Sequence, residues 1–149
     1  MAKGDRRNGV SPELDALAAE LLGDALDIVA GGGELGVLLV AEDAAGNVGS
    51  YEFTDDGPEQ CLQMARDRVK ELGSSGDPAA GLASPVRYAI CYEAAVADEA
   101  GAYQDALLLE FGERGYKSYS GYSLFSGRGT GDDFTWTDPA PAGELEPLL

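Results

Sequence analysis

The chain has 149 residues, of which 27 are acidic and 10 are basic, and it contains no histidine. The net charge of -17 disfavours nucleic acids and anionic membrane surfaces as partners, because both attract proteins through clustered lysine and arginine. The missing histidine excludes Ser-His-Asp and Cys-His catalysis, histidine-ligated zinc and haem, and a histidine pH switch.

The first predicted element is a helix that follows a flexible leader at residues 1–10. It begins at Ser11, a good N-cap residue, with Pro12 in the first helical position. Apolar residues recur at steps of three and four from Leu14 to Val29, which predicts one buried face. Glycines at 31–33 end the helix. Its opposite face is acidic and has no basic residue: Glu13, Glu20, Asp24 and Asp27.

A hairpin and a second helix follow. The apolar run at 35–41 predicts a strand buried on both faces, and the alternation at 48–54 predicts its antiparallel partner. Residues 43–47 form the turn between them. A capping box at Asp56–Glu59 predicts the start of a helix that ends at Gly73 and carries three basic residues.

The second half of the chain reads as a loop and three strands. Glycine, serine and proline dominate residues 74–85, which predicts a linker or long loop. Alternating apolar residues then predict strands at 86–96, 106–111 and 116–125. Residues 134–136 form a short sixth strand or a packed plug, and the proline-containing stretch at 138–149 reads as a tail.

These elements predict the order α-β-β-α-β-β-β. The hairpin and the three later strands can join into one antiparallel sheet of about five strands, with two helices packed on it. We therefore expect an α+β fold with a single domain at 11–137, a leader at 1–10 and a tail at 138–149.

Tyrosine is the residue type most suggestive of a binding surface. Its apolar ring and polar tip suit interfaces, although tyrosine is also simply a good strand former. Five of the seven tyrosines fall on two predicted strands, and we take them as interface or groove candidates: Tyr88, Tyr92, Tyr116, Tyr119 and Tyr122.

The acidic helix face offers a second candidate surface. Glu20, Asp24 and Asp27 could meet a basic partner or a divalent cation, but a solvated surface is the interpretation that we favour. Helical metal sites draw further ligands from a second helix, and none is evident here. We predict no catalytic residue, no metal and no cofactor. Cys61 and Cys91 are too few for a disulfide scaffold. Cys61 falls on the apolar face of its helix, so we expect it to be buried, and Cys91 falls on a strand face with Ala89 and Glu93.

The leading expectation is a small acidic, non-catalytic protein-interaction module, homodimeric, whose partner is another protein or a second copy. One alternative is a charge-driven binder that neutralises a basic partner, as an immunity protein, a secretion chaperone or a nucleic-acid mimic does. Another is a small carboxylate- or metal-dependent enzyme. Cytoplasmic residence is expected, because no apolar run reaches about 18 residues and no signal-peptide pattern is present.

Overall fold

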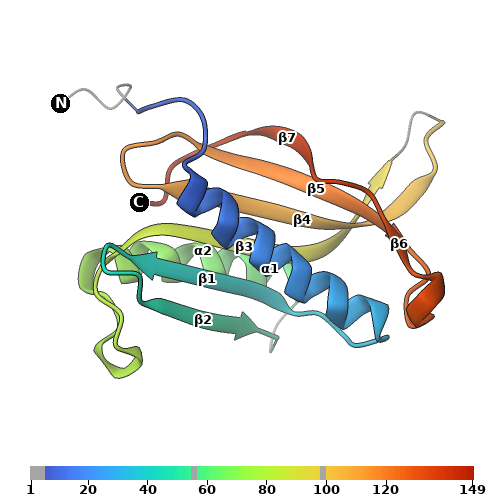
Figure 1. Ribbon diagram of the computed structural model, residues 1–149, viewed down its shortest axis with the longest axis horizontal. Helices are drawn as coiled ribbons and strands as arrows, with labels where there is room; N and C mark the ends of the chain where they lie inside the picture. The colour runs from blue at the N-terminus through green and yellow to red at the C-terminus, as the bar shows by residue number, and fades with distance from the viewer. Residues whose placement is uncertain (1–5, 55–56, 98–99) are drawn as a thin grey trace.

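The computed structural model describes residues 6–54, 57–97 and 100–149, and contains two α-helices and seven strands there (Figure 1). The helices are α1 (Pro12–Ala30) and α2 (Pro58–Ser75). The strands are β1 (Val37–Asp43), β2 (Val48–Phe53), β3 (Pro85–Ala97), β4 (Tyr103–Glu113), β5 (Ser118–Ser126), β6 (Thr135–Trp136) and β7 (Ala140–Leu145).

All strands belong to one antiparallel sheet with the order β2-β1-β3-β4-β5-β6, and β7 also pairs with β5. The predicted α+β class, the single antiparallel sheet and the order of its first seven elements are confirmed. The sheet gains β6 and β7 at the side of β5. Both additions are short or proline-containing, which is why their sequences carry a weak strand signal.

The two helices cover opposite faces of the sheet. On the face called here the α1 face, α1 packs over β1, β3 and β4, with Ala89 and Leu107 among the buried residues (Figure 1). On the other, the α2 face, α2 packs over β1, β2 and β3, with Leu39 and Ile90 fully buried. Because β1 and β3 are covered on both faces, β1 reads as a continuous apolar run.

The start of α1 is as predicted, since Leu14 donates its backbone N–H to Ser11 Oγ at 3.1 Å. The end of α2 differs, because the helix continues through Gly73 to Ser75. A side chain at Gly73 would lie 2.9 Å from the Leu149 side chain, so this glycine makes room for the end of the tail. Asp56, the predicted cap, lies outside the described residues, and Gly57 is the N-cap.

The predicted tail contains β7 and then crosses to the α2 face. Residues 140–145 pair with β5, and Leu148 and Leu149 pack against the core beneath α2. Arg6, from the predicted leader, donates from Nη2 to the Leu149 carbonyl at 2.6 Å. The division into a domain at 11–137, a leader and a tail stays a prediction, and these contacts connect all three parts.

Candidate functional site

The sheet distributes the five candidate tyrosines over both of its faces. Tyr88, Tyr92 and Tyr122 lie on the α2 face, and Tyr88 is only 1% exposed. Tyr119 lies on the α1 face, where its hydroxyl accepts the Gly9 N–H at 2.9 Å. Tyr116 lies in the β4–β5 turn with the Arg7 guanidinium 5.9 Å from its ring centre. The structure therefore brings Tyr92 and Tyr122 to one surface and separates Tyr116 and Tyr119 from it.

The surface that holds Tyr92 and Tyr122 is an apolar, partly exposed region of the α2 face that extends from the border of α2 across β4 and β5. Across β3, β4 and β5, Tyr92 is opposite Leu108 and Leu108 is opposite Tyr122. In the next row Ala94 and Leu124 flank the buried Ala106. We call the partly exposed members the tyrosine face: Tyr92, Ala94, Leu108, Tyr122 and Leu124. Neither row contains a charged residue.

An ion pair between Arg66, which is partly exposed, and the buried Glu110 borders the tyrosine face on the side of α2. Glu110 is 4% exposed, and Arg66 of α2 contacts both of its oxygens, with Nε to Oε1 at 2.9 Å and Nη2 to Oε2 at 2.5 Å. Tyr92 donates its hydroxyl to Glu110 Oε2 at 3.1 Å. Burial, reinforced by the Glu110 charge, raises the pKa of Tyr92 to about 12, so the phenol stays neutral.

The hydrophobic periodicity of the sequence did not predict this ion pair. The available signal was Glu110, a carboxylate inside an otherwise apolar strand, combined with a helix that holds three basic residues. Periodicity alone could not reveal which of these basic residues faces β4.

The acidic candidates Glu20, Asp24 and Asp27 are exposed on α1. No hydrogen bond or ion pair to these three carboxylates occurs within the described parts of the chain. Across the same described residues, no three His, Cys, Asp or Glu side chains lie together as a metal site would require. The α1 carboxylates thus form an unpaired acidic surface.

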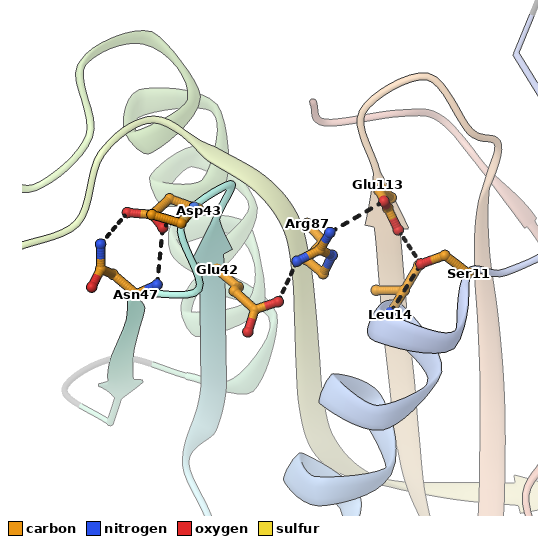
Figure 2. A network of polar contacts seen from close by, with 8 residues as sticks. Ser11, Leu14, Glu42, Asp43, Asn47, Arg87 and Glu113 are labelled. Carbon is orange, nitrogen blue, oxygen red and sulfur yellow. Dashed lines mark hydrogen bonds and ion pairs between the residues drawn. The ribbon is translucent and has the colours of Figure 1, made fainter.

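Most basic side chains are held by contacts within the fold. Figure 2 shows Arg87 of β3 between Glu42 of β1 and Glu113 of β4, with its Nη2 at 3.5 Å from Glu113 Oε2. Ser11 donates its hydroxyl to Glu113 Oε1 at 2.5 Å, which joins the start of α1 to the same network. Because arginines such as Arg87 are used internally, they do not neutralise α1.

The glycine-rich segment after β5 and the two cysteines have structural roles. Arg128 forms an ion pair with Glu93 and donates to the Gly33 carbonyl at 3.1 Å, so it joins this segment to the end of α1. Cys61 packs on the α2 face and Cys91 packs on the α1 face, so the two cysteines lie on opposite sides of the sheet. Burial raises the pKa of the Cys91 thiol to about 12 and keeps it protonated.

A hollow of about 580 Å³ lies on the α1 face beside β5. Its floor and walls are mostly apolar and include Val10, Leu109, Phe111, Tyr119 and Pro141. The rings of Phe111 and Tyr119 are 6.4 Å apart between centroids. Tyr119 lines this hollow, so the sheet lies between Tyr119 and the tyrosine face.

No family model, curated protein or solved structure matches this chain. Neither helix in the described residues is both long and apolar enough to span a membrane.

Proposed function

We propose that the chain is a non-catalytic protein-interaction module that forms a homodimer through the tyrosine face. The tyrosine face carries this proposal because it is an apolar, uncharged and partly exposed part of the sheet. Two chains that each carry a charge of -17 repel each other, so they associate most easily through a surface free of charge. Flat sheet faces of two copies can pack with their side chains interdigitated, at about 10 Å separation.

The internal use of the buried charges supports a role without catalysis. Glu110 is held by Arg66 and Tyr92, and the Arg87 guanidinium lies between two carboxylates. A group that is saturated by structural partners is a poor general acid or base.

Cytoplasmic residence is part of the same proposal, and the protonated, buried Cys91 suits a reducing compartment.

The dimer can be tested with a charge placed on the tyrosine face. Leu108→Lys puts an ammonium group at the centre of the face, and Met64→Lys puts the same group on an exposed position of α2. Sedimentation equilibrium at high micromolar concentration should show a dimer for the natural chain. The dissociation constant should rise at least about tenfold for Leu108→Lys, a loss of about 1.4 kcal/mol. Met64→Lys should leave it unchanged.

A monomeric natural chain at the highest concentration would refute self-association. A dimer that Leu108→Lys leaves intact would refute the tyrosine face as its interface.

A second candidate function is favoured by the unpaired carboxylates of α1, which suit a charge-driven binder of a basic protein. In a pull-down, the natural chain should retain a basic protein that moderate salt releases. The variant Glu20→Gln/Asp24→Asn/Asp27→Asn should fail to retain it. Retention of the same protein by both chains would rule out α1 as the contact.

A further inference from the structure

The two outer edges of the sheet differ in their prolines and in the regularity of their strand pairing. The edge at β7 carries Pro139 and Pro141, which lack a backbone N–H, and a register shift interrupts its pairing with β5. Such features block the addition of another strand. The edge at β2 has no proline, lysine or bulge, and its six residues pair with β1 in a regular register. The outer strand β6 has two residues, so among the described strands β2 presents the more open edge for a further strand.

The register fixes which backbone groups β2 presents outward. Asp43 donates its N–H to the Asn47 carbonyl at 3.0 Å, which begins the ladder between β1 and β2. Since bonding alternates along an antiparallel pair, residues 49, 51 and 53 face β1, and Val48, Ser50 and Glu52 face away. Within the described chain, no strand or loop makes a backbone hydrogen bond to these three residues.

The side chains beside this edge define what would bind there. Val48, Ser50 and Glu52 project on the α1 face, the face from which the unpaired α1 carboxylates rise. Glu52 is exposed and has no ion-pair partner among the described residues. Tyr51 and Phe53 project on the α2 face and are half-buried. One face of the edge thus carries the carboxylate of Glu52 beside the uncharged Val48 and Ser50, and the other face is apolar.

We infer that β2 is a strand-addition site for an extended segment of another protein in which basic and apolar residues alternate. Alternate side chains of an added strand point to opposite faces. Its basic residues would lie beside Glu52 on the α1 face, and its apolar residues beside Tyr51 and Phe53. The backbone groups of Val48, Ser50 and Glu52 would supply the ladder. This inference is independent of the dimer at the tyrosine face.

A second copy of the chain fits this edge poorly. Its own β2, Val-Gly-Ser-Tyr-Glu-Phe, contains no basic residue and would add another Glu52 to the α1 face. The charges therefore favour a basic segment over self-pairing at this edge.

The experiment uses a synthetic peptide of alternating lysine and valine, Lys-Val-Lys-Val-Lys-Val-Lys, and a control peptide of the same composition with the lysines in one block. Titration should show binding of the alternating peptide that weakens as salt is raised. Hydrogen exchange followed by NMR should show new protection at the outward amides of Val48, Ser50 and Glu52. Their inward neighbours Gly49 and Tyr51 should change little, because β1 already protects them.

Two variants sharpen the test. Ser50→Pro removes one outward N–H and should weaken binding about fivefold or more, whereas Ser50→Ala should not. Glu52→Gln leaves the strand intact and should also weaken binding, which keeps the test valid if the proline variant is poorly folded.

Equal binding of the two peptides, or binding without protection at β2, would overturn the inference by reducing it to general charge attraction. Protection of the same amides on concentrating the chain alone would assign the edge to a second copy and would also overturn it. The peptide experiment at β2 can be interpreted whether or not sedimentation shows a dimer at the tyrosine face.

Discussion

Asp43 shows what a single buried carboxylate does in this fold. Its Oδ1 accepts the backbone N–H groups of Ala45 and Asn47, each at 2.9 Å. Figure 2 shows the contacts between Asp43 and Asn47. Its Oδ2 accepts Asn47 Nδ2 and the backbone N–H of Ala83, each at 3.0 Å. Asp43 therefore fixes the β1–β2 turn and ties it to the segment that leads into β3.

These hydrogen bonds, above all the one from Ala83, lower the pKa of Asp43 from 3.8 to about 2. A carboxylate with a lowered pKa stabilises the fold fully above its ordinary pKa, and this contribution disappears as the pH falls through the folded value. We expect the free energy of unfolding to fall between pH 3.8 and about 2. Urea unfolding across this range should show a shallower fall for Asp43→Asn. The same slope in both chains would contradict the assignment.

At the scale of elements, the Arg66–Glu110 pair connects α2 to a strand it otherwise barely reaches. The helix packs over β1, β2 and β3, whereas Glu110 lies on β4. The Arg66 side chain is 34% exposed and that of Glu110 is 5% exposed, so removal of Arg66 would leave a carboxylate buried without its cation. Such a loss costs more than the intact pair contributes.

We expect Arg66→Met to lower the free energy of unfolding by about 2–3 kcal/mol. This is less than the loss typical of a fully buried ion pair, because the Arg66 side chain is partly open to solvent. The double variant Arg66→Met/Glu110→Leu should recover most of this loss, because it removes the stranded charge as well. Urea denaturation of the four chains of the cycle measures the coupling. Additive losses would show that the two side chains act independently.

At the scale of the whole molecule, negative charge is concentrated on α1, because many basic side chains pair with carboxylates elsewhere in the fold. Arg66, Arg87 and Arg128 each pair with a carboxylate inside the fold. Within the described residues, Glu20, Asp24 and Asp27 of α1 have no ion-pair partner. Asp27 lies in the last turn of the helix, where the helix dipole disfavours a negative charge.

Self-repulsion of this kind is weakened by salt. We therefore expect the Tm of the natural chain to rise as sodium chloride is added. The variant Glu20→Gln/Asp24→Asn/Asp27→Asn should melt a few degrees higher at low salt and respond less to added salt. Thermal unfolding followed by circular dichroism measures both effects. A triple variant with an unchanged salt response would show that the α1 face does not contribute to the repulsion.

Local patterns in the sequence predicted most helices and strands, but not all of the residues at which they begin and end. The cap at Ser11 and the alternation in β2 are local properties, and both predictions agree with the structure. Gly73 was wrongly predicted to end α2, because its role depends on Leu149, which is far away in the chain. β7 was missed as a strand because prolines weaken its signal and its pairing with β5 is a long-range contact.

The candidate surfaces divide in the same way. The sequence by itself determined the α+β class, the acidic face of α1 and the positions of the tyrosines on strands, since these follow from composition and periodicity. Only the tertiary structure decided that Tyr92 and Tyr122 share a surface while Tyr119 lies on the opposite face. It alone decided that Arg66 reaches Glu110 and that β2 is the more open edge. Strand order and register decide which side chains become neighbours, and they are set by packing between distant parts of the chain.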